Sequence, residues 1–407
     1  MMNWSEKTSV QAARAKASSI RAVVGKAMRH PDMVFFAGGE PSPDLFAYKE
    51  VRAAYDKVLG DRQLAAAALQ YSSSEGIPAL RDWVVQRMAD AGVSCTRDNV
   101  LITSGSQQGL DLVGRLFVDL ATPVYVQTPT YSGALQAFNA HGASFRMLPA
   151  VVTSELRPQR RGLIYVIADA QNPSGKTLTL EQRNETIRLA DRLELPIVED
   201  DAYRGLQFEG SRLPSLMSLA LDGREVDQGS AIHLGTFSKT IVPGLRVGWV
   251  VAPAPLIERL TAIKQGADLQ TSALAQMVAL ELVGLTTGEI VRKLSDAYKS
   301  KRDAMLAALH IEFGSEVEWT QPQGGFFVWM TLPEGIDATA ELEGAIAAGV
   351  VYVPGQSFHA DGSGKNTLRL SFSMMSEDRI REGVKRLGNA LRPAIARATH
   401  AVAGAEQ

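Results

Sequence analysis

A lysine and an arginine stand at a spacing that could anchor a small molecule. Lys239 comes just after an apolar run, in the segment Thr236-Phe-Ser-Lys239, and Arg246 follows seven residues later. In α/β proteins, side chains at the ends of strands form the ligand site. A lysine amine can condense with an aldehyde, while an arginine fork and hydroxyls such as Thr236 and Ser238 can hold a dianionic phosphate. A Ser-Lys pair alone is more often a surface turn, so the other segments must decide.

Three consecutive acids end another apolar run, in Pro196-Ile-Val-Glu-Asp-Asp-Ala-Tyr203. A carboxylate here can pair with the protonated nitrogen of a pyridine ring, and the charged ring then withdraws electrons from a carbanion on a substrate. Acids at a strand end could instead cap a helix or bind a metal ion. The presence of Lys239 decides in favour of the pyridine.

Two glycine-containing turns also follow predicted strands. The first, Asp169-Ala-Gln-Asn-Pro-Ser-Gly175, is by itself only a turn signal. The second, Thr103-Ser-Gly-Ser-Gln107, joins a strand to the start of a helix, where free amides and the helix dipole favour a phosphate. Its spacing matches neither a dinucleotide-binding fingerprint nor a P-loop, which argues against those nucleotide sites.

A sheet is needed to bring these segments together. Between about residues 99 and 252, short β-branched runs alternate with segments of helical period, which predicts a mainly parallel sheet covered on both faces. The predicted strands are Val100–Thr103, Val124–Gln127, Ser144–Leu148, Leu163–Ile167, Pro196–Asp200, Ala231–Leu234 and Val247–Val251. Apolar residues at helical spacing predict a helix over Gln107–Leu120, with Ser106 at its N-terminus. Thr179, with Gln182 three residues on, predicts a capping box.

The pattern changes after about residue 285, where a long charged segment through Leu309 predicts a helix. Further strands are predicted at Phe326–Met330, Val350–Val353 and Thr367–Phe372, before a closing helix after Ser376. We therefore expect a second, smaller α+β domain. The predicted parts are an N-terminal arm with part of the small domain (1–50), a large domain (51–290), the small domain (291–395) and a flexible tail rich in Ala and Gly (396–407).

Composition excludes several classes of protein. The 407 residues carry a net charge of −2, which leaves no basic excess for a nucleic acid or an anionic membrane. Cys95 is the single cysteine, so an intrachain disulfide is impossible, and the six histidines show no metal-ligand spacing. Neither a signal peptide nor a membrane-spanning run is evident. We expect a cytoplasmic protein without a metal site.

Taken together, the motifs resemble those of one family, the fold-type I enzymes of pyridoxal 5′-phosphate (PLP). Within it they are similar to the class I/II aminotransferases, and among these to the 2-aminoadipate and kynurenine aminotransferase group. The motifs are Phe36-Ala-Gly-Gly39, Gln70-Tyr71, Ser104-Gly-Ser-Gln107, Pro129-Thr-Tyr131, Gln171-Asn-Pro-Ser-Gly175, Glu199-Asp-Asp-Ala-Tyr203, Ser238-Lys239 and Leu368-Arg369-Leu-Ser-Phe372. The resemblance spans almost the whole chain and implies an aspartate-aminotransferase-like α/β fold, with a seven-stranded large domain and a smaller α+β domain.

The resemblance also implies roles for individual residues. Lys239 would form the Schiff base with PLP and carry the proton, and Asp200, three residues before the tyrosine, would pair with the pyridine nitrogen. Tyr203 and Asn172 would hydrogen-bond the phenolic oxygen, and Tyr131 would stack on the ring. The phosphate would be held by Gly105, Ser106, Gln107, Thr236, Ser238 and Arg246, with Tyr71 reaching in from a neighbouring subunit. A homodimer with shared sites is therefore implied.

The resemblance also implies residues that contact the substrate, and some of them depart from the family pattern. Arg369 would grip the substrate α-carboxylate, with Asn172 and Gly39 close by. Glu40 stands where relatives commonly carry an apolar residue, so it could select a cationic or hydroxylated side chain; equally, it could face solvent or cap backbone amides. Arg21 matches a position used for a distal carboxylate, although a solvated arginine is the more common case.

The leading hypothesis is an aminotransferase that moves an amino group from an L-amino acid to a 2-oxo acid, through a Lys239 aldimine and pyridoxamine phosphate. Ala168 and Ala170, where relatives carry proline and an aromatic residue, could leave room beside the cofactor. With Glu40, they keep open elimination, replacement or carbon–carbon bond formation on the same cofactor. A non-catalytic effector-binding module of a transcription regulator is the third class. Only about 30 residues precede the Phe35 region, too few for a DNA-binding domain.

Overall fold

A seven-stranded sheet forms the larger part of the molecule in the computed structural model, which describes residues 2–14, 25, 32–149, 152–153 and 155–405. The strand order is β2-β8-β7-β6-β5-β3-β4, in which β8 runs antiparallel to both neighbours and the other pairs are parallel. The strands are β2 Val100–Thr103, β3 Pro123–Val126, β4 Ser144–Met147, β5 Leu163–Val166, β6 Ile197–Asp201, β7 Ala231–Thr236 and β8 Gly248–Val251. The mainly parallel sheet predicted from the sequence is confirmed.

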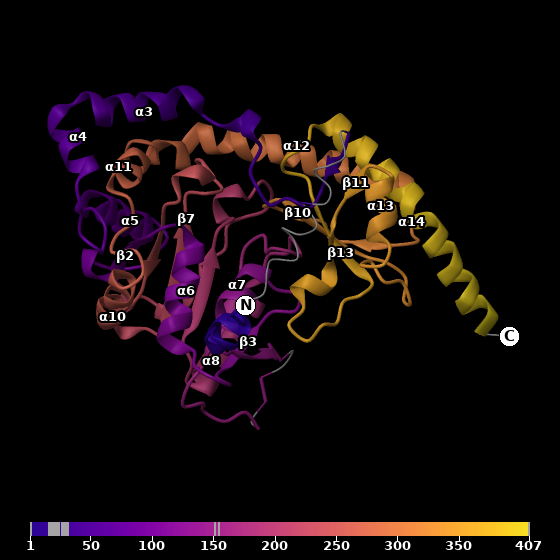
Figure 1. The fold of residues 1–407 in the computed structure, drawn as a ribbon, viewed down its shortest axis with the longest axis horizontal. Helices are drawn as coiled ribbons and strands as arrows, with labels where there is room; N and C mark the ends of the chain where they lie inside the picture. Colours follow the sequence, from indigo (N-terminus) through magenta and orange to yellow (C-terminus); the bar gives the residue numbers. More distant parts are fainter. Residues whose placement is uncertain (1, 15–24, 26–31, 150–151, 154, 406–407) are drawn as a thin grey trace.

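Helices cover both faces of this sheet (Figure 1). On one face pack α6 (Ser106–Phe117), α7 (Ser132–Ala140) and α10 (Ala254–Gln265), which share an apolar cluster with alternate residues of the strands. The other face is covered by α5 (Pro78–Asp90), α8 (Leu180–Leu193), α9 (Leu216–Leu221) and α11 (Ala273–Glu281). Because both faces are buried, the strands are almost continuously apolar, as is typical of parallel sheets.

Two of the predicted helices form with small differences. Helix α6 starts at Ser106 as predicted and buries Leu110 and Val113, but it ends at Phe117, so Leu120 lies outside it and is exposed. Helix α8 begins with the predicted capping box, in which Thr179 and Gln182 each accept a backbone N–H of the other. Since a capping box satisfies two helix-end donors at once, the start of α8 is encoded locally.

A second, smaller assembly packs beside the large sheet. Its sheet has the order β12-β13-β10-β9, built from β9 Glu318–Trp319, β10 Phe327–Thr331, β12 Val353–Pro354 and β13 Thr367–Ser371. The separate pair β1 (Val34–Phe35) and β11 (Val350–Val351) is parallel. The predicted single strand Val350–Val353 is therefore wrong, because the chain changes sheets at Tyr352, whose buried hydroxyl donates to Ala338 O at 2.7 Å.

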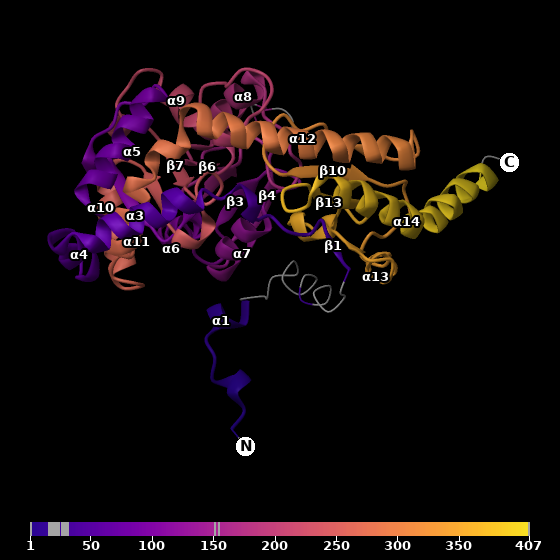
Figure 2. The same cartoon turned by 90° about the horizontal axis from the view of Figure 1, so that it is seen from above.

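Long helices frame the smaller assembly. Helix α12 (Gly288–Phe313) extends from the large sheet to the small one and contacts α14 (Glu377–Ala405), as Figure 2 shows. Helix α14 includes residues 396–405, and the flexible tail expected over 396–407 stays a prediction. The other α-helices of the described residues are α1 (Val10–Arg14), α3 (Tyr48–Gly60), α4 (Arg62–Leu69) and α13 (Leu342–Ala347). The domain boundaries at 50/51 and 290/291 stay predictions.

None of the helices in the described ranges combines the length and apolar character needed to cross a membrane.

Candidate active site

Lys239 lies in the connection between β7 and β8, where the chain turns back without a crossover helix. Its amine donates a hydrogen bond to Gly39 O at 2.9 Å and lies 5.7 Å from the centre of the Tyr203 ring. Burial lowers the pKa of Lys239 to about 8, although the nearby Glu40 carboxylate opposes the shift. A lysine with this pKa has a useful fraction of neutral, nucleophilic amine near neutral pH.

The three acids at the end of β6 point in different directions, because side chains alternate along a strand. Glu199 faces α9 and caps it, accepting the backbone N–H groups of Leu216 and Met217 at 2.8 and 3.0 Å. Asp201 lies 3.9 Å from the ring of His233, also on that side of the sheet. Helix capping, one alternative weighed from the sequence, thus applies to Glu199, and Asp200 is left facing the other way.

Asp200 is 4% exposed and only half satisfied. Its Oδ2 accepts a hydrogen bond from the Tyr165 hydroxyl at 2.8 Å, whereas its Oδ1 has no partner among the described residues. Burial raises the pKa of Asp200 to about 6, and the bond from Tyr165 opposes this rise. Since an unpartnered buried carboxylate oxygen is costly, the geometry fits a cationic N–H donor that approaches Oδ1.

Tyr165 was not singled out from the sequence. It lies at the centre of the apolar strand β5 and is fully buried. A usable signal exists, because the hydroxyl of a buried tyrosine needs a hydrogen-bond partner and the acids of β6 are in the neighbouring strand. Which of the three acids it meets depends on the register, in which Tyr165 pairs with Val198 and so shares a face with Asp200.

Arg369, in β13 of the small sheet, reaches the same site. The guanidinium is 2% exposed and stacks 4.3 Å from the centre of the Phe327 ring. It donates to Asn172 Oδ1 at 2.9 Å and to Ala37 O at 2.6 Å, and its Nε has no partner among the described residues. Burial lowers the pKa of Arg369 to about 10, so it remains charged at neutral pH. Asn172 also hydrogen-bonds Tyr203, whose pKa burial raises.

Hydroxyls, an arginine and a helix N-terminus converge beside Lys239. Thr236 donates to Ser238 Oγ at 2.9 Å, and Arg246 Nη1 donates to the same oxygen at 3.3 Å. Gly105 precedes α6 with φ 82° and ψ 166°, and a Cβ added there would lie 2.6 Å from Arg246 Nη2. The first two amides of α6, those of Ser106 and Gln107, precede the bonds of the helix, which start with Gln108 N–H to Gly105 O at 3.2 Å. This group of donors, which we call the phosphate cradle, suits a dianion.

Gln107 and Tyr131 border the cradle. The Tyr131 hydroxyl donates to Gln107 Oε1 at 3.3 Å, and Gln107 Nε2 donates to Gly133 O at 3.0 Å. Tyr131 also acts electrostatically on Tyr203 and Arg369, so the structure brings it into the same site. Stacking of Tyr131 on a cofactor ring stays a prediction.

The segment around Glu40 closes the site beside Lys239. Glu40 is largely exposed, and its Oε2 accepts the backbone N–H of Gly39 at 2.7 Å. This bond matches the alternative in which the carboxylate caps backbone amides. The same carboxylate raises the pKa of both Lys239 and Arg369, which places its charge within reach of the site. An added Cβ at Gly39 would lie 3.3 Å from the Phe327 ring, so space at this wall is limited.

The structure places three of the four remaining residues singled out from the sequence. Ala168 and Ala170 are buried in apolar clusters rather than beside open space, and Ala170 packs against Gly324 and Gly325. Tyr71 is 79% exposed on the single chain, just beyond α4. Arg21 lies outside the described residues.

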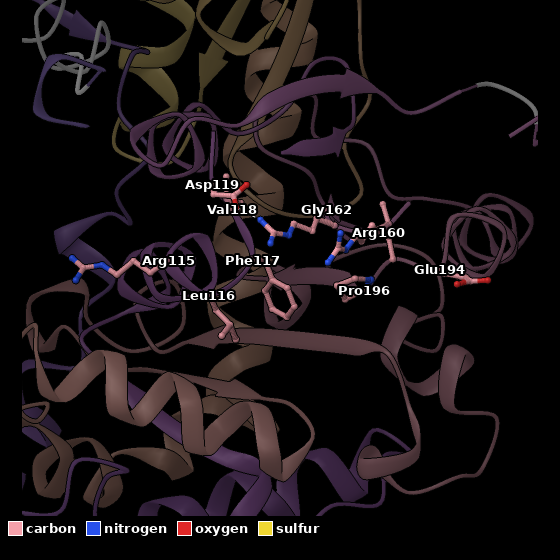
Figure 3. A pocket seen from close by; sticks show the side chains of 11 residues that line it. Arg115, Leu116, Phe117, Val118, Asp119, Arg160, Gly162, Glu194 and Pro196 are labelled. Atoms are coloured by element: carbon pink, nitrogen blue, oxygen red, sulfur yellow. Dashed lines mark hydrogen bonds and ion pairs between the residues drawn. The ribbon is translucent and has the colours of Figure 1, made fainter. Parts of the chain in front are cut away.

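A separate cavity of about 480 Å³ lies at the opposite, amino-terminal edge of the sheet (Figure 3). Arg115, Arg160 and Arg161 border it, together with Asp119 and Glu194. Arg161 is bonded to Asp119, and Arg115 is bonded to Asp111 at 2.9 Å. Since opposite charges offset each other and ligands of parallel sheets bind at the carboxyl ends of the strands, the cavity is not the active site.

The residues at the carboxyl edge fit PLP group by group. The Lys239 amine can take the aldehyde, the free Oδ1 of Asp200 can accept from the pyridine nitrogen, and the phosphate cradle can hold the dianion. Arg369 adds a cation for a carboxylate on the other side. The fold and the site thus define a PLP-binding protein that also receives an anionic substrate group.

Comparison with known proteins identifies the family. The model for aminotransferase class I and II matches residues 33–387. The chain is 41% identical over 403 residues to the 2-aminoadipate transaminase of Thermus thermophilus, covering 97% of this chain and 99% of that one. The solved alpha-aminoadipate aminotransferase of Thermus thermophilus, complexed with N-(5′-phosphopyridoxyl)-L-leucine, has a TM-score of 0.87 at 40% identity and covers 97% of this chain and 100% of that chain.

A kynurenine aminotransferase of Pyrococcus horikoshii, solved with PMP, has a TM-score of 0.88 at 35% identity, covering 96% of this chain and 98% of that chain. This chain therefore belongs to the class I and II aminotransferases. It is a PLP-dependent aminotransferase with amino acid and oxo acid substrates. The expected fold and cofactor are confirmed, and family membership favours amino transfer over the other PLP chemistries and over a non-catalytic module.

Proposed function

We propose that Lys239 is the residue that binds the cofactor covalently and moves the proton at the substrate α-carbon. The observation that carries this proposal is a part-buried amine, with its pKa lowered to about 8, on which the half-satisfied carboxylate of Asp200 acts electrostatically. PLP supplies an electrophilic carbonyl and a cationic pyridine ring that withdraws electrons from the α-carbon. Lys239 would bind the carbonyl carbon through its ε-amine, and Asp200 Oδ1 would hold the proton on the ring nitrogen.

The other residues would bind and orient. The phosphate cradle would fix one end of the cofactor through Thr236, Ser238 and Arg246. Asn172 and Tyr203 would orient the phenolic oxygen, and the Arg369 fork would hold the substrate α-carboxylate. Held in this way, the α-hydrogen of the substrate would lie near the Lys239 amine, where proximity would contribute much of the catalysis.

Two measurements test the assignment of Lys239. After borohydride reduction of the holoenzyme, mass spectrometry should locate the cofactor adduct on Lys239, and Lys239→Ala should lose that adduct and its visible absorbance. An adduct on any other residue would overturn the assignment. When a panel of amino acids is mixed with the holoenzyme without an acceptor, each amino acid that is a donor should yield one equivalent of oxo acid per site. Continued turnover without an acceptor would instead favour elimination or replacement.

We further propose that Glu40 selects donors whose side chain carries a cation or a hydroxyl. The carboxylate acts on both Lys239 and Arg369 and is held by the short bond from Gly39 N–H at 2.7 Å. An amino acid whose α-carboxylate is bound by Arg369 could extend its side chain to the Glu40 carboxylate. Glu40 would give up its hydrogen bond from Gly39 N–H and gain one from the substrate side chain. This exchange costs little, because the two hydrogen bonds are of similar strength.

The Glu40 proposal is tested by the ratio of kcat/KM for L-ornithine or L-lysine to that for L-leucine. In Glu40→Gln, which keeps the shape, this ratio should fall roughly twofold to fivefold, because an ion pair to an exposed carboxylate is worth about 0.2–1 kcal/mol. Glu50→Gln, an exposed acid on α3, is the matched control and should leave the ratio unchanged. An equal ratio in the wild type and both variants would contradict the proposal and would leave Glu40 only the role of accepting the Gly39 N–H.

A homodimer with shared sites is also proposed. The support is the exposed Tyr71 ring just beyond α4, the neighbouring exposed Leu69, and the family resemblance that assigns Tyr71 to a partner's phosphate. Large exposed apolar side chains close together are typical of subunit contacts. The expected cytoplasmic location likewise stays a prediction, which fractionation of the native host would test.

A further inference from the structure

A polar network adjoins the phosphate cradle at the turn between β2 and α6. Lys264, in α10, is completely buried, and its amine donates to Asp268 Oδ1 at 2.5 Å. The other carboxylate oxygen of Asp268 accepts from Gln108 Nε2 at 2.6 Å and from Ser104 Oγ at 3.2 Å. One acid therefore joins α10, α6 and the β2–α6 turn.

Gln108 completes a ring of contacts around that turn. Its Oε1 accepts the backbone N–H of Ser104 at 2.7 Å, while its Nε2 is held by Asp268. The orientation of the Gln108 amide is therefore determined, because only one end of it can accept. Ser104 O in turn accepts from Arg246 Nη2 at 3.5 Å. The turn is thus held at its N–H, its hydroxyl and its carbonyl.

The conformation held in this way is one that most residues avoid. Gly105 has φ 82° and ψ 166°, a region open essentially to glycine alone. Glycine adopts many other conformations with equal ease, so its own preference cannot keep the turn in this state. Hydrogen bonds have to select it. Thr103 and the Gln108 N–H bond Gly105 itself, with Thr103 Oγ1 donating to Gly105 O at 3.1 Å, and Asp268 and Gln108 hold the preceding residue, Ser104.

Burial of Lys264 is otherwise hard to explain. Burial lowers the pKa of its amine, and the hydrogen bond that it donates to Asp268 is what opposes the shift. A buried ion pair of this kind often contributes little net stability compared with apolar side chains of the same size. What it does supply is a fixed position for the Asp268 carboxylate, which lies 30% exposed at the rim of the network.

We propose that Asp268, fixed by Lys264, is a positioning residue for cofactor phosphate: it holds Gln108 and Ser104 so that the β2–α6 turn and Arg246 stay set for the dianion. Neither Lys264 nor Asp268 is assigned to the phosphate cradle itself. The proposal rests on the proposed phosphate cradle, and it applies only to ligands that carry a phosphate group. Loss of Asp268 should weaken binding of a phosphorylated ligand only.

The test compares PLP with pyridoxal, which carries the same aldehyde and ring but no phosphate. In Asp268→Asn apoenzyme, the dissociation constant of PLP should rise roughly 10- to 100-fold, because charge-assisted hydrogen bonds are lost around the turn. The dissociation constant of pyridoxal should stay within about twofold, since the contacts of the ring and of Lys239 are unchanged. Glu289→Gln, which breaks the exposed pair of Glu289 with Lys293, is the matched control and should alter neither value.

A second variant keeps the test decisive if Asp268→Asn folds poorly. Gln108→Met removes the link between Asp268 and the Ser104 N–H without leaving a buried charge, and it should show the same selective loss. The double variant should lose no more than about twice the larger single loss, because both residues act through one chain of bonds. An equal fall in PLP and pyridoxal affinity, or no fall in either, would overturn the proposal. The borohydride adduct on Lys239 is unaffected by these outcomes and tests the proposed function separately.

Discussion

At the scale of single residues, the site is organised around two groups whose charge is disfavoured by burial. Burial lowers the pKa of Lys239 to about 8 and raises the pKa of Asp200 to about 6. Both pKa values are thereby moved towards neutral pH. In the free protein each is destabilised in its charged form. A ligand that takes up the amine and offers a cationic N–H to the carboxylate relieves both costs.

The pKa of Lys239 predicts how apoenzyme takes up PLP. Only the neutral amine attacks the aldehyde, and with a pKa of about 8 roughly a tenth of it is neutral at pH 7. The rate of reconstitution, followed by absorbance, should therefore rise about tenfold between pH 7 and pH 9 and then level off. Glu40→Gln removes a charge that raises this pKa, so its midpoint should lie at lower pH. A rate that keeps rising through pH 10 would contradict the assignment.

Tyr165 supplies the second prediction at this scale. Its hydroxyl is a charge-assisted donor to Asp200 Oδ2, and such a bond is worth about 1.5–3 kcal/mol. Tyr165→Phe should lower kcat/KM roughly 10- to 100-fold and raise the pKa of Asp200 further, because a lowering contact is lost. Tyr125→Phe is the control, since Tyr125 pairs with Ile164 and faces the other side of the sheet. Equal activity in the two variants would show that Tyr165 has no positioning role.

At the scale of elements, the connections that follow β2, β5, β6 and β7 carry the site, and β1 and β13 add the second wall. The turn before α6 is the most constrained of them. Arg246 and the α6 amides can approach one anion only because Gly105 lacks a Cβ. This is why a short glycine turn joins these two elements.

Gly105→Ala should therefore weaken PLP binding at least tenfold, since the backbone conformation alone costs about 1–3 kcal/mol and the new methyl would press on Arg246. Titration of apoenzyme with PLP, followed by absorbance, measures the change. Gly244→Ala is the control, because an added Cβ there meets nothing within 4 Å. Equal affinity in the two variants would mean that the turn can relax without loss of the cradle.

Element boundaries were predictable where the signal was local. The Thr179–Gln182 capping box and the β-branched runs of the large sheet are encoded within a few residues. The capping box forms as predicted, and each of the seven strands forms with its ends within two residues of the predicted bounds. The run Val350–Val353 splits between two sheets, a choice made by packing around Tyr352 rather than by propensity. Residues 396–405 lack a core pattern but are rich in alanine, so they continue α14, since extending a helix is far easier than starting one.

At the scale of the whole molecule, the two sheets meet across the site. Arg369 from the small sheet contacts Asn172 from the large one, and Lys239 contacts Gly39 of the N-terminal segment. The site therefore exists only when both assemblies are in place. In the proposed dimer, the site would also need a second chain, which would contribute its Tyr71.

Shared sites predict that inactive variants complement each other. Lys239→Ala and Tyr71→Ala should each be inactive or nearly so as homodimers. Mixed and re-formed subunits should regain roughly a quarter of wild-type activity, because half of the dimers are then mixed and each mixed dimer has one intact site. Size-exclusion chromatography with light scattering provides the check on dimer formation. Mixtures with no recovered activity, from proteins shown to exchange subunits, would contradict a shared site.

The sequence by itself determined the class of sheet, the order of the motifs and the chemical types at the site. These are properties of short segments, in which apolar period, turn residues and reactive side chains stand close together along the chain. Recognition of the family followed from them.

Only the tertiary structure decided which of the three acids of β6 faces the site and that Tyr165 bonds it. It also decided that Asp268 joins Lys264 to the turn before α6. These facts depend on strand register and on contacts between residues more than a hundred positions apart, such as Ser104 with Asp268. Local propensity does not specify such contacts, because they arise from how whole elements pack against each other.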